Sequence, residues 1–594
     1  MENTHPRSEY QQRLAAREAM VRTLAGRESL VANLRLIVFA LGLIIAWAAL
    51  WMHWIPWQVI GLPIAAFVAL ALWHDRILRA RANARLAVAH YQRCLARVED
   101  RWAGTGIPGD ELLPEHHPYA VDLDLFGRGS LFELLCTART RAGERTLAAW
   151  LTAPADAAMV RSRQEALQEM RDRLDLGEEL SLLGSDVNRG VLPEVLVKWA
   201  EAPQTFTTNT PRRIAFVVGA YNLLALAAWI ALETGPSPLL LGMIVAVLAE
   251  RITGNRAHRV VESVSEPCRE LDVLARVLAR LEREPFTHGR LRDVQASLVS
   301  DGARASECIA RLDRLVTWHE SRQNQLFIPI ALMTMWDVHF AYAFERWRAR
   351  YGGSVRRWLE ALGELEALVS LAAYHYEHPE DPFPEIVETG AEFDGVDIGH
   401  PLLGATGVRN TLRLDNKSRI YIVSGSNMSG KSTLLRTVGI NTVLALAGAP
   451  VCAASLRVTP MKIGATLRVQ DSIQTGDSRF YAEIRRLHQL SLLATGPMPL
   501  LFLLDEILHG TNSHDRKIGA EAVLRSFIEA GGIGLVTTHD LALTSSADHL
   551  PDAVNVHFED HIKDGQLAFD YRMRPGVVQK SNALELMRRI GLPI

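Results

Sequence analysis

A phosphate-binding loop constrains the fold of this chain more than any other sequence feature. Its residues follow the pattern G-x-x-x-x-G-K-[ST] and are Gly425, Ser426, Asn427, Met428, Ser429, Gly430, Lys431, Ser432 and Thr433. The apolar, β-prone segment 419–424 precedes the loop, and 433–438 reads as the start of a helix. A strand, a glycine loop and a helix N-terminus in this order place backbone N–H groups around phosphate oxygens. We therefore expect an α/β P-loop NTPase domain, in which Lys431 reaches the β- and γ-phosphates and Ser432 binds Mg²⁺.

Two further apolar runs end in polar residues that suit the same chemistry. Residues 499–504 form a continuous apolar run, typical of a strand buried in a parallel sheet, and Asp505 and Glu506 follow it. We expect Asp505 to hold the Mg²⁺ shell and Glu506 to polarise the attacking water. Residues 534–538 form another strand, which ends at His539. A single His after a strand is usually structural, but beside the other two motifs His539 is placed to sense the γ-phosphate.

These motifs and the segments between them resemble the MutS family of DNA mismatch-repair ATPases. The pair Asn427–Met428 inside the loop is distinctive of that family, and 505–512 resembles its Asp-Glu-Ile…Gly-Thr segment. Residues 476–483 match its G-x-S-x-F-x-x-E signature, and 400–403 match the entry to its ATPase domain. Residues 571–581 are similar to its closing segment. Five motifs in the family's order make this resemblance highly specific.

The resemblance implies further features of the site. The family's ATPase works with ATP and Mg²⁺ as a dimer, with nucleotide between the subunits, so Ser478 is expected to reach the γ-phosphate bound by the partner chain. Asn410 matches a family Asn near the base. Val408 stands where the family carries an aromatic residue beside adenine, which puts base stacking in question but not the phosphate chemistry. A weaker similarity to the family's helical core extends through 122–166.

Composition gives little support for a general nucleic-acid binder. The chain has 594 residues, too many for one core, and a net charge of −3 from 64 basic and 67 acidic side chains. Any DNA contact must come from a local patch. The five cysteines show no metal-ligand spacing, which indicates a reduced compartment without structural zinc. They are Cys94, Cys136, Cys268, Cys308 and Cys452.

Two adjacent apolar stretches near the N-terminus are long enough to cross a membrane. Residues 36–54 contain no Asp, Glu, Lys or Arg, and 57–73 form a second stretch after a turn at Ile55–Pro56. Each approaches the ~20 residues that span a bilayer. Tryptophans lie at the ends of both, as interfacial anchors do. A buried hairpin in a soluble protein is the alternative.

A second apolar pair lies at 214–232 and 239–248, and its second member is short. A third stretch, 327–344, contains Asp337 and His339 and is expected to be a core helix. Arginines flank both pairs on their outer sides, and the two connecting turns carry no Lys or Arg. The positive-inside rule therefore predicts a multi-pass protein of the cell (inner) membrane, with both termini and the ATPase domain in the cytoplasm.

The expected architecture is an ABC-like, MutS-type P-loop NTPase domain, preceded by an all-α core with transmembrane helical hairpins. The first hairpin takes the place of the family's N-terminal mismatch-reading domain. The predicted units are an N-terminal cytoplasmic helix at 1–33, a transmembrane hairpin at 34–73, a helical connector at 74–104, the first part of the helical core at 105–205, a second transmembrane hairpin at 212–251, the second part of the core at 255–380, and the ATPase domain at 385–594.

Two hypotheses of function remain open from the sequence. In the first, a membrane-anchored MutS-like ATPase acts on DNA, including mismatched DNA, or on a repair complex. In the second, the same nucleotide-driven dimer switch acts on protein or membrane partners without DNA. A transporter is disfavoured, because no ionisable residue marks a path at mid-membrane. The basic-aromatic run 346–358 could contact phosphates and stack on bases, although a solvated helix face is the preferred interpretation.

Overall fold

The computed structural model describes most of the chain. The described residues are 5–183, 192–206, 208–265, 268, 271–321, 327–426, 428–468, 479–508, 512–539, 541–550, 552–563 and 566–578. Asn427 in the phosphate loop, Ser478 and the closing Lys580–Ser581 pair lie outside them.

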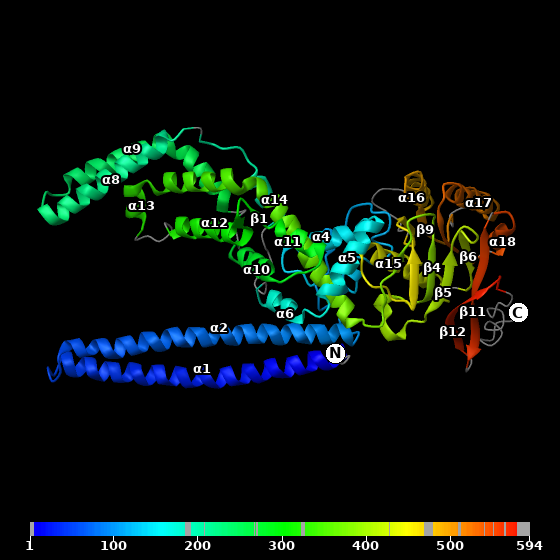
Figure 1. Ribbon diagram of the computed structural model, residues 1–594, viewed down its shortest axis with the longest axis horizontal. Helices are drawn as coiled ribbons and strands as arrows, with labels where there is room; N and C mark the ends of the chain where they lie inside the picture. Colours follow the sequence, from blue (N-terminus) through cyan, green and yellow to red (C-terminus); the bar gives the residue numbers. More distant parts are fainter. Residues whose placement is uncertain are drawn as a thin grey trace.

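Two long helices form the first hairpin, which runs along one side of the molecule (Figure 1). They are α1 (Pro6–Leu50) and α2 (Gly61–Val98), and the turn between them contains the short helix η1 (Trp57–Ile60). The boundaries predicted at 33/34 and 73/74 correspond to no break in either helix. Composition changes there from polar to apolar, but both kinds of sequence are compatible with a helix, so the backbone hydrogen bonds continue.

A second hairpin, α8 (Thr210–Leu232) and α9 (Ser237–Ser265), extends from the helical core toward the same end of the molecule as the tip of the first hairpin (Figure 1). The helix α9 is much longer than the short apolar stretch predicted. The stretch 327–344, expected to be one core helix, is divided into two, because the chain breaks at Met335, which has a φ of 49°; its second part, the start of α14, is buried in the core as expected. The preceding helix α13 (Ile328–Thr334) packs against the second hairpin, and the side chain of Asn222 donates a 2.9 Å hydrogen bond to the carbonyl of Met333.

The helical core is arranged around α14 (Trp336–Glu377). Gly363 on α14 lets α4 approach closely, since a Cβ there would lie 2.7 Å from the carbonyl oxygen of Ala142. Before the second hairpin the core contains η2 (Asp110–Leu112), α3 (Leu131–Leu135), α4 (Arg141–Thr152), α5 (Ala157–Met170), α6 (Leu174–Leu183) and α7 (Pro193–Ala200). After it come α10 (Leu271–Arg283), α11 (Gly289–Ala296), the strand pair β1 (Val299–Ser300) and β2 (Ala303–Arg304), and α12 (Ala305–Glu320).

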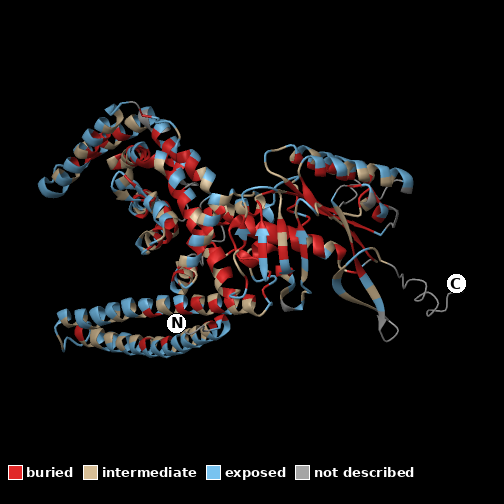
Figure 2. Ribbon diagram, turned by 45° about the vertical axis from the view of Figure 1, so that its right-hand side comes forward, coloured by how far each residue is buried: buried red, intermediate tan, exposed pale blue. Residues whose placement is uncertain are grey.

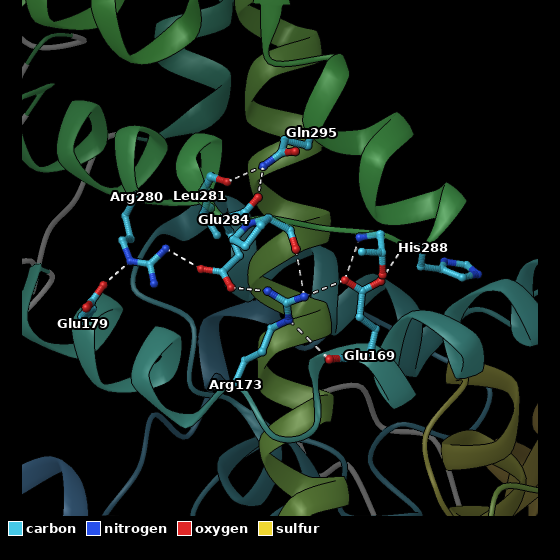
Figure 3. A network of polar contacts seen from close by, with 10 residues as sticks. Glu169, Arg173, Glu179, Arg280, Leu281, Glu284, His288 and Gln295 are labelled. Atoms are coloured by element: carbon cyan, nitrogen blue, oxygen red, sulfur yellow. Dashed lines mark hydrogen bonds and ion pairs between the residues drawn. The ribbon is translucent and has the colours of Figure 1, made fainter.

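A polar network ties these two parts of the core together, as Figure 3 shows. Arg173 pairs with Glu284 and, at 2.7 Å, with Glu169. Arg280 bonds Glu284 at 2.6 Å and also pairs with Glu179. The ion pairs therefore connect residues that are more than 100 positions apart in the chain. The second hairpin lies between these residues in the sequence.

The aromatic residues of the run 346–358 are part of the core. Trp347, Tyr351 and Trp358 are buried, and the indole N–H of Trp347 donates to the carbonyl of Cys308 at 2.8 Å. Arg346 is exposed, and Arg356 is also exposed but bonds Glu201. The interpretation of base stacking is therefore wrong for these tryptophans. The alternative interpretation, a helix face exposed to solvent, applies only to some of the arginines.

The C-terminal domain contains a six-stranded sheet in the order β12-β11-β6-β10-β9-β8. All neighbours are parallel except β12, which pairs antiparallel with β11. The strands are β6 (Ile420–Ser424), β8 (Lys462–Thr466), β9 (Leu500–Asp505), β10 (Ile533–Thr538), β11 (Ala553–Lys563) and β12 (Gln566–Pro575). The predicted strands before the loop, before Asp505 and before His539 agree with β6, β9 and β10, and parallel pairing brings their carboxyl ends to one edge.

Helices cover both faces of this sheet. The helix α15 (Lys431–Ala447) is almost wholly buried between the sheet and the helical core, and a Cβ on its Gly439 would touch Leu123 and Leu503 at 2.7 Å. The opposite face carries α16 (Arg479–Ala494) and α17 (Ser513–Glu529). Shorter helices are η4 (Pro401–Thr406), α18 (Leu541–Thr544) and η5 (Ser545–Asp548). A second sheet, in the order β3-β7-β4-β5, contains β3 (Glu385–Ile386), β4 (Phe393–Ile398), β5 (Asn410–Leu414) and β7 (Ser455–Val458).

Candidate nucleotide site

The phosphate loop connects β6 directly to α15. Gly425 and Gly430 have φ values of 145° and 102°, which side chains with a Cβ rarely adopt. The helix begins at Lys431, whose ammonium group donates to the carbonyls of Gly425 at 2.9 Å and Ser426 at 2.8 Å. Burial lowers the pKa of Lys431, and the nearby Glu506 and Asp505 oppose this shift. The lysine thus lies inside the loop, at the positive end of the α15 dipole.

Two hydroxyl groups of the loop fit a phosphate ligand. The Oγ atoms of Ser426 and Ser429 are buried and have no hydrogen-bond partner among the described residues. Burying a hydroxyl without a hydrogen-bond partner lowers the stability of the folded protein by about 1–3 kcal/mol. Two such hydroxyls in one turn therefore indicate that a ligand binds there. Phosphate oxygens would accept hydrogen bonds from both. The residues present therefore fit a nucleotide phosphate chain.

Asp505 is held from two sides at the carboxyl end of β9. The hydroxyl of Ser432 donates to its Oδ2 at 2.6 Å, and the hydroxyl of Thr537 donates to its Oδ1. Thr537 was not among the predicted site residues. The parallel register of β9 and β10 places it directly opposite Asp505, which a sequence without a strand alignment does not reveal. A hydroxyl and a carboxylate are the two protein ligands that Mg²⁺ takes in P-loop sites, beside waters and phosphate oxygens.

Glu506 and His539 face each other beyond Asp505. The Nδ1 atom of His539 lies 3.2 Å from Oε1 of Glu506. Glu506 has a φ of 51°, a strained value for a residue other than glycine, and its backbone N–H donates to Thr537 Oγ1 at 3.1 Å. Both side chains are partly exposed, at 30% and 42%, so water reaches them. This arrangement suits a carboxylate that polarises water, with a histidine that orients it.

The glutamate of the 476–483 signature supports the segment after these carboxylates. Glu483 on α16 is 4% exposed, and its carboxylate accepts a hydrogen bond from the backbone N–H of Leu508. Leu508 has a φ of 57° and follows Glu506 by two residues. Glu483 is therefore a positioning residue for the turn that carries Glu506.

An aromatic side chain lies beside the loop, although Val408 does not supply one. Asn410 donates to the carbonyl of Tyr571 at 3.1 Å and accepts from the N–H of Met573 at 2.8 Å. A Cβ on Gly430 would lie 3.1 Å from the Tyr571 ring. Tyr571 is 44% exposed and belongs to the closing segment of the family. The sequence motif therefore included this tyrosine but did not indicate that it lies beside the phosphate loop. Ser478 and Asn427 lie outside the described residues, and their predicted roles stay predictions.

The family comparison covers this site. The model for MutS domain V matches residues 421–594, a range that contains the phosphate loop, Asp505, Glu506 and His539. Residues 421–594 are therefore similar to the ATPase domain of the MutS family. The resemblance read from the motifs is thereby confirmed, and the α/β fold of the C-terminal domain is that of MutS domain V.

Curated MutS relatives match only part of this chain. "DNA mismatch repair protein MutS 2" of Halobacterium salinarum is 36% identical over 242 residues, which are 39% of this chain and 27% of that protein. "Endonuclease MutS2" of Thermus thermophilus is 32% identical over 40% of this chain and 31% of its own length. "DNA mismatch repair protein MSH6" of Arabidopsis thaliana is 32% identical over 40% of this chain and 19% of its own length. The chain thus spans about a third or less of these relatives.

Proposed function

We propose that the chain is a Mg²⁺-dependent ATPase of the MutS type that two apolar hairpins anchor in a membrane. The observation that carries the enzymatic part is the joint position of Ser432, Asp505 and Glu506 at one edge of the sheet, beside the unpartnered hydroxyls of the loop. Bound Mg²⁺ would neutralise charge that develops on the phosphates. Lys431 would hold phosphate oxygens, and Glu506 would take a proton from water.

The base of ATP would lie between Tyr571 and the strand that carries Asn410. The ring of Tyr571 replaces the stacking surface that Val408 cannot offer. Asn410 holds the segment that carries Tyr571, because its amide N–H donates to the carbonyl of Tyr571 and its amide oxygen accepts from the N–H of Met573. Stacking against an exposed aromatic ring tolerates different bases, whereas the phosphate contacts do not depend on the base. We therefore propose a site whose affinity comes mainly from the phosphate chain.

Purified protein tests the ATPase proposal directly. Lys431→Ala removes the principal cation of the loop and is expected to weaken ATP binding at least ~10-fold. Lys417→Ala is the matched control, since Lys417 is an exposed lysine of the same domain. Wild-type binding and turnover in Lys431→Ala would contradict the proposal, and so would equal losses in both variants.

The position of the two hairpins supports the membrane part of the proposal. Both reach away from domain V, and their tips lie at the same end of the molecule (Figures 1 and 2). Within the described part of the chain, three helices are long and apolar enough to cross a membrane, and a bent α9 would be a fourth. In the first hairpin, 6% and 0% of the apolar windows of its two arms are buried. Such a continuous apolar surface marks contact with lipid or with a partner.

Large side chains cover the tip of the first hairpin. Trp51 and Trp54 are 80% and 75% exposed. Exposure of apolar surface to water costs ~25 cal/mol per Å², and contact with lipid removes this cost. The backbone hydrogen bonds of a helix are made within the helix, so they persist in lipid. The second hairpin has a more mixed surface, since 28% of the window in α8 is buried, partly against α13.

Cysteine labelling in intact cells tests the orientation. The native cysteines give little background, because four are buried and Cys452 is half-buried. A membrane-impermeant maleimide is expected to label Met52→Cys and Gly235→Cys, which lie at the two tips. Ser455→Cys, an exposed position of domain V, should react only after the cells are opened. Equal labelling of all three positions in intact cells would exclude the proposed topology.

The partner on which the nucleotide-driven dimer acts is a separate question. The names of the relatives point to DNA, and we propose an ATP-driven dimer that acts at the membrane on DNA or a repair complex. The burial of Trp347 and Trp358 and the net charge of −3 favour the second candidate, a dimer that acts on protein or membrane partners without DNA. Binding to homoduplex and mismatched DNA over a salt series separates the two, since DNA binding weakens steeply as salt rises.

A further inference from the structure

A cavity of about 470 Å³ lies at the base of the first hairpin, where α2 meets the helical core. It belongs neither to the nucleotide site nor to the apolar tips. Its polar lining consists of His90, Gln92 and Arg93 on α2, Thr105 in the loop that follows, Arg139 before α4, and Ser181 on α6. No carboxylate lines it among the residues that the structure describes.

Neither guanidinium group in this cavity forms an ion pair with a carboxylate of the described residues. Arg93 donates to the carbonyl of Cys136 at 2.8 Å, and the side chain of Arg139 has no hydrogen bond or ion pair with any described residue. Burial lowers the pKa of Arg93 to about 10, and repulsion from Arg97 and Arg139 adds to the shift. Burial likewise lowers the pKa of Arg139. Positive charge is therefore concentrated here at a cost in stability.

Three buried carboxylates of the surrounding elements already accept hydrogen bonds from other groups. Glu377 accepts from Arg97 at 2.7 Å and from the hydroxyl of Tyr10 at 3.2 Å. Glu366 accepts from the backbone N–H of Arg139 at 2.9 Å and from Thr140. Glu133 accepts from two backbone N–H groups, at 2.9 and 2.7 Å. None of them forms an ion pair with Arg93 or Arg139, although the charge of Glu366 partly offsets the effect of burial on the pKa of Arg139.

We propose that this cavity binds a small, soluble anion with a phosphate group, held between Arg93 and Arg139. Guanidinium groups form strong charge-assisted hydrogen bonds with phosphate oxygens, and the cavity has the volume of a typical small-molecule site. Such a ligand would neutralise both arginines and join α2 to the segment that enters α4. The site is thus also a joint between the first hairpin and the core.

A lipid headgroup does not fit this position. Arg93 follows Trp73, the end of the apolar stretch, by 20 residues of continuous helix. At 1.5 Å per residue the cavity lies about 30 Å beyond that end, outside the headgroup layer of a membrane at the tips. This exclusion rests on the proposed membrane anchoring, whereas the charge argument does not.

Calorimetric binding of inorganic pyrophosphate to the full-length protein in phospholipid-free detergent tests the proposal. The protein carries Lys431→Ala throughout, so that the phosphate loop contributes little binding. We expect saturable binding at one site per chain. Arg93→Gln and Arg139→Gln should each weaken it at least tenfold, and Arg139→Lys should restore part of the loss. Arg85→Gln, an exposed arginine of α2 outside the cavity, should change affinity less than twofold.

Several results would overturn the proposal. One is the absence of saturable pyrophosphate binding while the chain keeps its thermal transition. Another is equal affinity in Arg93→Gln and Arg85→Gln. If reconstitution with anionic phospholipid blocks pyrophosphate binding, the anion is a headgroup and the soluble ligand is wrong. If short duplex DNA binds through Arg93 and Arg139 but pyrophosphate does not, the cavity is part of a nucleic-acid surface.

Discussion

The hydroxyl of Ser432 donates a 2.6 Å hydrogen bond to Oδ2 of Asp505, which joins the first turn of α15 to the end of β9. The two residues lie 73 positions apart in the chain. This bond fixes a hydroxyl and a carboxylate side by side, where one cation can bind both. Ser432→Ala is therefore expected to raise the Mg²⁺ concentration for half-maximal ATP hydrolysis at least ~10-fold, because each metal ligand contributes more than a typical neutral hydrogen bond.

A Mg²⁺ titration of turnover at saturating ATP measures this effect. Ser455→Ala is the matched control, because Ser455 is an exposed serine of the same domain outside the loop. An unchanged Mg²⁺ requirement in Ser432→Ala would show that the serine has no part in metal binding.

Glu506→Gln separates binding from chemistry. The side chain keeps its size and its place beside His539, but it can no longer take a proton from water. Turnover is expected to fall by ~100-fold or more, whereas ATP affinity stays within about threefold of wild type. Single-turnover kinetics and equilibrium binding of ATP provide the two measurements. Normal turnover in this variant would remove Glu506 from the role of base.

A mixing experiment tests the expected composite site. The resemblance to the family implies that Ser478 of one subunit completes the site of the other. Ser478→Arg and Lys431→Ala chains are each expected to be inactive alone. Mixed dimers should regain about one working site, because one interface combines an intact loop with an intact serine. If well-mixed heterodimers recover no activity, each chain completes its own site.

The pair Arg97–Glu377 secures the first hairpin to the end of α14. Their side chains are 4% and 0% exposed, and Nε of Arg97 donates to Glu377 at 2.7 Å. Glu377→Gln leaves the guanidinium buried without a counter-charge, which costs about 3–5 kcal/mol. The variant should show a clearly lower thermal midpoint in detergent. Glu201→Gln, which breaks an exposed pair with Arg356, should change the midpoint little. Equal midpoints in the two variants would contradict the structural role of Glu377.

Local patterns were enough to predict the elements around the nucleotide site, but long-range register was not. The strands before Gly425, Asp505 and His539 could be read from apolar runs and the residues that end them. Thr537 and Tyr571 could not, because Thr537 reaches Asp505 only through pairing of β9 with β10, and Tyr571 reaches Gly430 only through the β11–β12 hairpin. Their contacts depend on strand order.

In the helical region, too, the sequence did not predict features that depend on tertiary packing. The apolar stretch 327–344 has the length of one helix, and hydropathy does not indicate that Met335 takes a left-handed conformation and divides it. The burial of Trp347 and Trp358 likewise depends on packing around α14, which a basic-aromatic pattern does not reveal.

Alkaline carbonate extraction of membranes from cells that express the full-length chain tests the central claim most directly. The account expects the chain to stay in the membrane pellet and the washed pellet to hydrolyse MgATP, with this activity absent from membranes that carry Glu506→Gln. Deletion of 1–80 should leave part of the protein in the pellet if the second hairpin also spans the membrane. A full-length chain that fractionates as soluble without detergent would contradict the membrane anchoring.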